Sequence, residues 1–506
     1  MQKLAVAAFL SLSLIAIDTA QSATFNVTNT NATGAGSFRQ AMIDANASLD
    51  ASNTIQVDSG LSGTITPQFI SSDLPLIESQ QLTINGPGAD LLTLDLTSLQ
   101  RLTLESGVTQ LQINDLAISG GTAFRGGCLN SEHGAELLMS GVIFENCTAV
   151  TTNTTENARG GAIYSTGMLV LQDSTLKDNQ ALGGVDAGAE GGAIYLAPLA
   201  GGVTLTIRRS LVNGNDASSD KNGASVLGGA IRVTGNVNTV IEDSGFTGNR
   251  TVLTGTGSSG DGGAISGLFS QLTLRRNLFY ANSSAGSASV ISIGASNPAD
   301  RSPTDIENNT FYFNDGNRNG VVNNGAAIFL NRSALRMRNN SFRDNKTSIG
   351  GGSLHYGGDI DLISVSNNAF DIDSQDGSQS CSISFGVTPD ASFTGMFNYF
   401  TDDSCTFIAG AGTQHPTLRL EATTFPANAT AFTLIPKGPS PLIDGGATAV
   451  SDTDWTLCPL KDQVGFPRPL DSDGDGDARC TAGAGETAFI LPSVIFNDGF
   501  EDPGIL

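Results

Sequence analysis

Basic residues, histidines and long apolar runs are scarce in this chain. Its 506 residues include 25 Lys+Arg against 49 Asp+Glu, a formal net charge of -24 at pH 7, and 3 His. An acidic surface repels phosphates, so we expect neither nucleic-acid binding nor electrostatic docking to membranes. After residue 23 no stretch approaches the roughly 18 consecutive apolar residues of a membrane-spanning helix. The sequence therefore predicts no transmembrane segment in the mature chain.

The composition favours a packed, loop-rich β protein. Charged residues make up only 15% of the chain, whereas hydrophobic residues reach 39% and glycine numbers 61. This hydrophobic content is too high for a disordered acidic chain, and the glycines follow no collagen-like triplet period.

The N-terminus has the pattern of an export signal. Lys3 precedes an apolar run over residues 4–17, which small residues at 20–23 follow. This pattern predicts a secretory signal peptide over residues 1–23, with a buried N-terminal helix as the alternative. We therefore expect a monomeric protein that is secreted or displayed on a bacterial cell surface.

Export predicts that the cysteines form disulfides, because thiols pair in oxidising compartments. The six cysteines form three separated couples, and this clustering favours pairing within each couple among the 15 possible connectivities. The couples are Cys128 and Cys147, Cys381 and Cys405, and Cys458 and Cys480. Zinc is the weaker interpretation, because the chain has no C-x-x-C motif and its histidines are far apart in sequence.

An internal repeat runs through most of the chain. An aromatic or aliphatic residue, here called the anchor, recurs every 28 to 36 positions, usually with Asn three residues later. The anchors are Phe144, Leu176, Val212, Phe246, Phe279, Phe311, Phe342 and Phe370. Leu116 is a ninth candidate anchor.

Two strands flank each anchor in this pattern. Apolar residues stand five and usually seven positions before the anchors, and a Gly-Gly-Ala-Ile signature opens several repeats, as at 160–163 and 228–231. Alternation of this kind predicts strands with one buried face. A repeat of roughly 30 residues cannot close a core alone, so repeats must stack. We predict an all-β, right-handed parallel β-helix.

The predicted organisation has five parts. A signal peptide (1–23) precedes an N-terminal cap with the first coils (24–110), the repeat β-helix (111–400), the last coils with a loop-rich C-terminal cap (401–490), and a tail (491–506). Ser37 and Gln40 form a candidate capping box for a helix whose apolar face would close the N-terminal end of the stack. That face comprises Phe38, Ala41, Met42 and Ala45.

Two polar columns predict contacts between turns. Ser or Asn stands two positions before most anchors, where amides could hydrogen-bond from turn to turn. Four positions before the anchors the charge alternates, which would keep the strands in register. This charge column comprises Gln172, Arg208, Glu242, Arg275, Glu307 and Arg338. We expect exposed pairs, none of which matters much alone.

The residue after each signature Ile would point outward. Aromatic and polar side chains in this outward column suit sugar rings, although ordinary aromatic cover of a sheet explains them too. The candidate binding residues are Tyr164, Tyr195, Arg232, Phe329 and His355.

Four aspartates alternate with small residues near the C-terminus. Asp471, Asp473, Asp475 and Asp477 have the spacing of carboxylates that bind calcium. Ala482 stands where an EF-hand needs a bidentate Glu, so a solvated acidic turn is the alternative. No cofactor is required by this sequence, and calcium is the one candidate.

The repeats and both ends resemble known secreted families. The alternating Gly-Gly-Ala-Ile and Phe-x-x-Asn motifs over residues 126–373 resemble the repeats of polymorphic outer-membrane proteins, which are β-helical surface adhesins. The segment 36–46, Gly-Ser-Phe-Arg-Gln-Ala-Met-Ile-Asp-Ala-Asn, looks like that of CSLREA-type secreted β-helix proteins, with Gly36, Phe38 and Gln40 as departures. The blocks at 440–446 and 462–469 are similar to the closing coils of such proteins.

This resemblance implies a pectin-lyase-like solenoid that presents an elongated surface for adhesion or glycan binding. The alternative is a polysaccharide lyase or glycoside hydrolase, since such enzymes share the fold. The polygalacturonase tracts Asn-Thr-Asp, Gly-His-Gly and Arg-Ile-Lys are absent here, and carboxylate pairs such as Asp359 with Asp361 or Asp402 with Asp403 are weak candidates alone. We expect a binding protein without its own catalysis.

Overall fold

A computed structural model describes most of residues 22–486. The gaps are 68–73, 98–100, 152–155, 186, 200–201, 257–258, 296–300, 317–325, 348–350, 359–360, 373–378, 385–393, 406–411 and 423–432. The predicted signal peptide up to residue 21 and the predicted tail lie outside the described residues. Among the described residues, no helix is long and apolar enough to cross a membrane.

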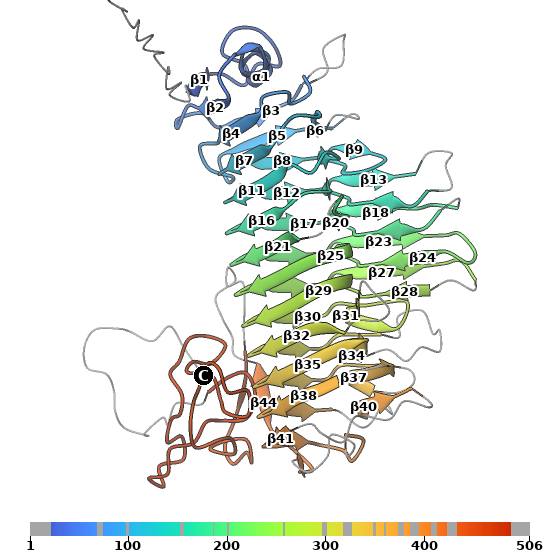
Figure 1. The fold of residues 1–506 in the computed structure, drawn as a ribbon, viewed down its shortest axis with the longest axis vertical. Helices are drawn as coiled ribbons and strands as arrows, with labels where there is room; N and C mark the ends of the chain where they lie inside the picture. The colour runs from blue at the N-terminus through green and yellow to red at the C-terminus, as the bar shows by residue number, and fades with distance from the viewer. Residues whose placement is uncertain are drawn as a thin grey trace, which may run out of the picture.

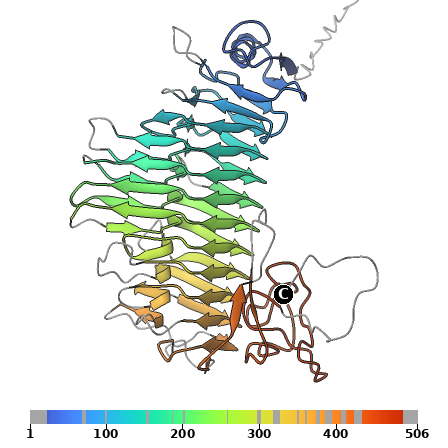
Figure 2. The same ribbon diagram turned by 180° about the vertical axis from the view of Figure 1, so that it is seen from behind.

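The chain forms a parallel β-solenoid of about 10 turns with one helix. Figure 1 shows the strands stacked along the long axis, and Figure 2 shows the same stack from behind. The predicted parallel β-helix is therefore confirmed, while its right-handed sense remains a prediction.

The largest sheet has 21 strands in two parallel rows, which merge in the long strands β25 and β29. One row comprises β1(Ser22–Val27), β2(Ser52–Val57), β4(Gln81–Asn85), β7(Gln110–Asn114), β11(Glu136–Ser140), β16(Leu169–Gln172), β21(Val203–Arg208), β25(Ile231–Glu242), β29(Ile265–Arg275), β32(Ser302–Glu307), β35(Ser333–Arg338), β38(Asp361–Ser366) and β41(Thr394–Met396). The other adds β6(Leu102–Leu104), β10(Leu129–Ser131), β15(Ile163–Ser165), β20(Ile194–Leu196), β31(Ala288–Ala295), β34(Ala326–Asn331), β37(Gly351–Gly358) and β40(Gln379–Ile383).

A 13-stranded sheet carries the anchors. Its strands are β3(Gly63–Ile65), β5(Leu92–Asp95), β8(Ala117–Ser119), β12(Ile143–Glu145), β17(Thr175–Lys177), β22(Leu211–Asn213), β26(Gly245–Thr247), β30(Leu278–Tyr280), β33(Thr310–Tyr312), β36(Ser341–Arg343), β39(Ala369–Asp371), β42(Asn398–Phe400) and β43(Gly412–Gln414). We call it the anchor sheet.

Three smaller sheets complete the described strands. One comprises β9(Thr122–Ala123), β13(Thr148–Val150), β18(Gln180–Leu182), β23(Asp216–Ser219) and β27(Arg250–Leu253). A second comprises β14(Ala158–Arg159), β19(Ala189–Glu190), β24(Ser225–Leu227) and β28(Ser259–Asp261), and the third is the antiparallel pair β44(Leu420–Ala422) and β45(Leu434–Pro436).

The anchors meet in register inside the solenoid. Phe246, Phe279, Phe311, Phe342 and Phe370 stack at ring-centroid distances of 4.6 to 5.2 Å, and Phe400 extends the ladder by one turn. The predicted aromatic ladder is confirmed. The ninth anchor was predicted wrongly, because Ile118, and not Leu116, pairs with Phe144.

Tight corners on either side of the anchor strands explain that shift. The residues three positions before and two positions after the anchors have left-handed backbone angles, as at Asp115 (φ 52°) and Asp243 (φ 52°).

The Gly-Gly signature allows successive turns to pack closely. Gly228 has φ 68°, and a Cβ on Gly229 would lie 2.0 Å from the carbonyl oxygen of Gly263 in the next turn.

Two amide columns form continuous ladders: the Asn three positions after the anchors, for which no hydrogen bonding was predicted, and the predicted column two positions before them. Within the first, each Asn Nδ2 donates to the Oδ1 of the next turn at 2.8 to 3.1 Å and to a backbone carbonyl. This ladder comprises Asn179, Asn215, Asn249, Asn282, Asn314 and Asn345. The second comprises Asn277, Asn309, Asn340, Asn368 and Asn398. Burial of these amides is compensated because their donors and acceptors are paired.

The helix α1(Phe38–Ala47) lies at the N-terminal end of the stack (Figure 1). Ser37 Oγ accepts the N–H of Gln40 at 3.2 Å, as the capping box predicts, while the Gln40 side chain donates to Asp44 instead of reaching back. The four residues of its predicted apolar face are buried, so the end of the core is closed.

Residues 440–486, here called the flank segment, lie beside the later turns and contain none of the described strands (Figure 1). Gln463 Nε2 donates to the carbonyl of Asn277, and Asn339 donates to the carbonyls of Thr481 and Gly483. The expectation that this stretch forms closing coils is wrong. It covers a side of the solenoid, because the corners there carry Asn308, Asn339 and Asn367, whose amides bond its backbone.

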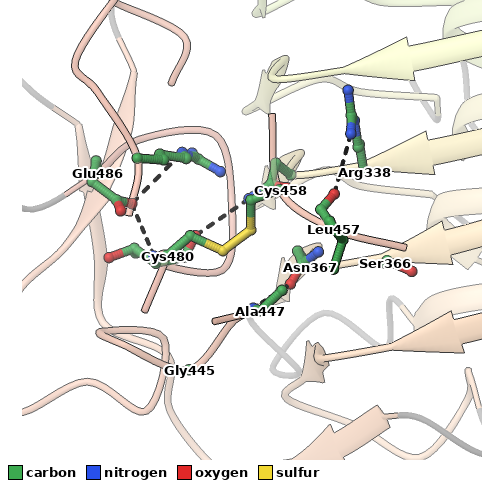
Figure 3. The surroundings of a disulfide bond; sticks show 12 residues. Arg338, Ser366, Asn367, Gly445, Ala447, Leu457, Cys458, Cys480 and Glu486 are labelled. Carbon is green, nitrogen blue, oxygen red and sulfur yellow. Dashed lines mark hydrogen bonds and ion pairs between the residues drawn. A yellow bond between two sulfur atoms is a disulfide. The ribbon is translucent and has the colours of Figure 1, made fainter. Parts of the chain in front are cut away.

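All three predicted cysteine couples are disulfides. The bond between Cys458 and Cys480 joins two parts of the flank segment, one near Arg338 and one near Glu486 (Figure 3). Close by, the side chains of Arg468 and Glu486 are both buried, and Arg468 Nε lies 3.7 Å from Glu486 Oε2. Desolvation raises the pKa of Glu486 to about 7. The flank segment therefore has its own covalent and ionic core.

Candidate functional site

The outward column exists, but most of it is covered. Tyr164 pairs with Tyr195, Tyr195 with Arg232, and Phe329 with His355, in the predicted register. Tyr164 is only 7% exposed and Tyr195 only 6%, because Arg125 and Arg159 lie over their rings at 5.4 and 5.1 Å. The expectation that these tyrosines face solvent is wrong, since loop side chains shield the sheet.

Arg232 and Phe329 keep more access than the tyrosines. Arg232 donates to Ser266 at 2.8 Å, and desolvation lowers its pKa. Phe329 stacks on His355 at 5.2 Å. The column is a stack of mutual contacts rather than an open platform.

His355 is 2% exposed, with its ring nitrogens 2.6 Å from Ser382 Oγ and 3.0 Å from Ser384 Oγ. Burial lowers its pKa to about 4. The imidazole is thus neutral at neutral pH, and its hydrogen bonds join it to the next turn.

A pH dependence of stability follows for His355. Its pKa is about 4 in the folded chain and near 6.5 when unfolded, so the unfolded state binds the proton first. We expect the free energy of unfolding to fall as pH decreases from 6.5 to 4. His355→Gln should flatten this limb of a urea-midpoint profile, whereas His133→Gln, at an exposed histidine, should leave it unchanged. Urea-midpoint profiles that run parallel for the two variants would show that His355 does not cause this pH dependence.

Aromatic rings reach solvent on the anchor sheet instead. Tyr280 and Tyr312 follow successive anchors with ring centroids 5.6 Å apart, and Phe313, 51% exposed, lies at 60° to Tyr312. Arg343 lies over Tyr312 at 6.0 Å, and Lys346 over Phe313 at 5.9 Å. We call these five residues the aromatic cluster. Sequence reasoning missed it, although aromatic residues directly after the anchors Phe279 and Phe311 were a signal.

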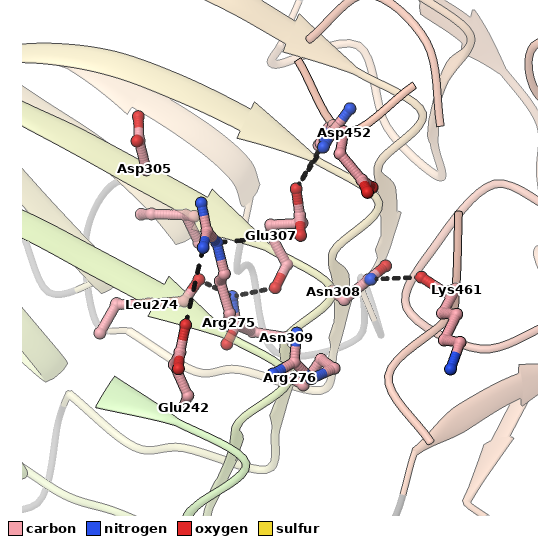
Figure 4. Close-up of polar contacts among 12 residues, drawn as sticks. Glu242, Leu274, Arg275, Arg276, Asp305, Glu307, Asn308, Asn309, Asp452 and Lys461 are labelled. Carbon is pink, nitrogen blue, oxygen red and sulfur yellow. Dashed lines mark hydrogen bonds and ion pairs between the residues drawn. The ribbon is translucent and has the colours of Figure 1, made fainter. Parts of the chain in front are cut away.

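The charge column forms the predicted ion pairs. Arg208 Nε lies 3.2 Å from Glu242. Arg275 lies 3.6 Å from Glu242 and 4.0 Å from Glu307 (Figure 4). Arg338 differs, because it is 1% exposed beneath the flank segment and donates to Glu307 at 2.8 Å. The expectation that every member is exposed is therefore wrong at this end.

A groove lies where the flank segment meets the solenoid. Its volume is about 460 Å³. Asp243, Arg276, Glu307 and Asn308 line it from the solenoid, and residues 452, 459–461 and 463–465 line it from the flank segment. Asn308 Nδ2 donates to the carbonyl of Lys461 at 2.7 Å, which joins the two walls (Figure 4). Only the tertiary structure creates this flank groove.

The predicted calcium ligands are partly brought together. Asp471 and Asp473 lie with Asp444 so that one carboxylate oxygen from each is within 4.8 Å of the others. Asp475 accepts the N–H of Asp477, whose carboxylate pairs with Arg479. Sequence reasoning missed Asp444, because it stands far upstream of the aspartate run.

The Asp444 carboxylate suits a cation. Its Oδ2 accepts the N–H groups of Ser472 and Asp473, and its buried Oδ1 has no hydrogen-bond partner in the described part of the chain. Desolvation, with the charges of Asp473 and Asp471, raises its pKa to about 6. Three hard oxygens with excess negative charge fit Ca²⁺.

The carboxylate pairs considered for catalysis have structural partners. Asp361 pairs with Arg301 at 3.2 Å, and its neighbour Asp359 lies outside the described residues. Asp402 accepts the N–H of Ser380 at 2.9 Å and the hydroxyl of Ser404 at 2.9 Å. These contacts hold turns in place.

Comparison with protein-family models, with curated proteins and with solved structures finds no match for this chain.

Proposed function

We propose that this is an exported, pectin-lyase-like β-helix protein whose elongated surface binds glycans or mediates adhesion, without catalysis of its own. The observation that carries this proposal is the aromatic cluster. Phe313 offers an exposed ring, and tyrosines, Arg343 and Lys346 stand beside it. A ring stacks on the apolar face of a pyranose while neighbouring polar groups take its hydroxyls.

Further features support display outside the cell. Three disulfides suit an oxidising compartment, and the N-terminal sequence has the pattern of a signal peptide. The resemblance to CSLREA-type and polymorphic outer-membrane proteins points the same way. A monomer is proposed as well.

Phe313→Ala should weaken binding to a recognised polysaccharide about threefold to tenfold, because the stacking ring is lost. Leu199→Ala, which also truncates an exposed apolar side chain, is the matched control and should bind normally. Affinity electrophoresis in gels containing single polysaccharides measures the effect. Equal retardation of both variants would show that the aromatic cluster does not bind the polysaccharide.

The alternative function is a polysaccharide lyase or glycoside hydrolase. The flank groove brings Glu307 and Asp452 near Lys461, which gives this alternative a location. Incubation with acidic and neutral polysaccharides, followed by assays for unsaturated products and reducing ends, separates the two functions. Turnover at enzymatic rates would replace the binding proposal.

We also propose that Asp444, Asp471 and Asp473 bind calcium as a structural ion. Calcium should raise the melting temperature at pH 7.5, and Asp444→Asn should abolish this shift, while Asp477→Asn should retain it. Since the Asp444 pKa is about 6, protons compete below that pH and the shift should fade as pH falls through 6. A calcium response that survives in Asp444→Asn would place the ion elsewhere.

A further inference from the structure

The flank groove has a mixed lining that suits a hydroxyl-rich ligand. Asp243 and Arg276 form a bidentate pair at 2.6 and 2.8 Å, with both side chains partly open to solvent. Opposite them, Leu460 is 48% and Val464 is 37% exposed. A fixed carboxylate–guanidinium pair offers acceptors and donors side by side, and the apolar side chains offer a surface for C–H groups.

The wall that carries those apolar residues is rigidly held. The Asp462 carboxylate accepts the N–H groups of Val464, Phe466 and Glu486 at 2.8 to 2.9 Å. Gln463 is anchored on Asn277 and Thr310 of the solenoid. The exposed side chains therefore project from a preformed loop, so a ligand loses little free energy to ordering the site.

Three carboxylates and two cations line the groove, so its lining carries one excess negative charge. Asp243 is paired with Arg276, and Glu307 with Arg338. The remaining two lining charges are one anion, Asp452, and one cation, Lys461, both exposed and in no ion pair within the described part of the chain. A neutral ligand is not repelled by this excess, whereas a polyanion is, and it must also approach a chain of net charge -24.

We propose that the flank groove is a second glycan subsite, and that it takes a neutral rather than an acidic oligosaccharide. This inference rests on the proposed glycan-binding function and adds a location and a charge class for the ligand. The corner residues Asp243 and Arg276 hold sugar hydroxyls, and Leu460 and Val464 contact the apolar face of the sugar.

Titration calorimetry on the full-length mature protein tests this with neutral hexasaccharides of glucose, xylose and mannose, and with hexagalacturonate as the acidic probe. Asp243→Asn keeps a residue that tolerates the left-handed corner and removes the charge of the pair. It should weaken binding of the recognised neutral sugar about tenfold. Val464→Ser should weaken it as well.

The matched control is Asp173→Asn. Asp173 pairs with Arg209 at 2.7 and 2.8 Å in the same corner column, also with a left-handed backbone, but does not line the flank groove. Its affinity should equal that of the unaltered protein. Melting temperatures verify that each variant is folded.

The outcomes separate this inference from the function on which it rests. Binding that Phe313→Ala weakens and Asp243→Asn does not would overturn the flank subsite alone. Tighter binding of hexagalacturonate than of any neutral sugar would overturn the inference that the ligand is neutral. Binding of none of the probes, together with no retardation by any polysaccharide, would overturn the glycan-binding function itself.

Discussion

Phe311→Ala is expected to lower the free energy of unfolding by about 3 to 5 kcal/mol. Phe311 is fully buried in the middle of the aromatic ladder, with ring centroids at 4.8 Å to Phe279 and 4.6 Å to Phe342. Truncation removes its apolar burial and leaves a cavity that neighbouring turns, held by parallel pairing, cannot close. Urea unfolding followed by circular dichroism measures the loss.

Phe313→Ala is the matched control for that experiment, because the same residue type stands two positions later on the surface. We expect a change within about 0.5 kcal/mol. Tyr164→Ala should fall between the two, since its ring is covered by Arg125 although it lies outside the core. Equal midpoints for Phe311→Ala and Phe313→Ala would contradict the inside and outside assignment.

Arg338→Met should release the flank segment. Arg338 Nη1 donates to the carbonyls of Ser451, Asp454 and Leu457. Removing the guanidinium leaves these acceptors and the buried Glu307 without their donor, a loss of roughly 3 to 5 kcal/mol for one half of a buried ion pair. Trp455, the one tryptophan, lies over the Arg338 guanidinium at 4.7 Å, so its fluorescence reports the change directly.

Arg208→Met tests the same column where it is open. Arg208 is 47% exposed along its side chain and pairs with Glu242 at 3.2 Å, so we expect a loss of only about 0 to 1 kcal/mol that fades at high salt. A large effect at Arg208, or an unchanged Trp455 emission in Arg338→Met, would show that burial by the flank segment does not decide the importance of these arginines.

The periodic features of the fold were predictable from the sequence. Phe311 and Asn314 recur in their columns turn after turn, and a stacked parallel fold places equal positions of successive repeats directly next to one another. The ladder of rings, the amide ladders and the charge column follow from that rule, whereas the three disulfides were predicted from the local clustering of the cysteines. Leu116 was misplaced because a two-residue shift at a corner keeps the residue buried and leaves the apolar pattern intact.

Accessibility, and with it the candidate site, was decided by tertiary structure. Tyr164 points outward from β15 and Phe313 from the corner after β33, yet Arg125 covers the first and the second remains open. Arg208 and Arg338 occupy one column, but only Arg338 lies under the flank segment. Repeat spacing determines neighbours along the stack, because hydrogen-bonded strands repeat at a constant distance. Which outward positions stay exposed depends on aperiodic loops and on a segment more than a hundred residues away, whose packing follows from shape and hydrogen bonding and not from any period.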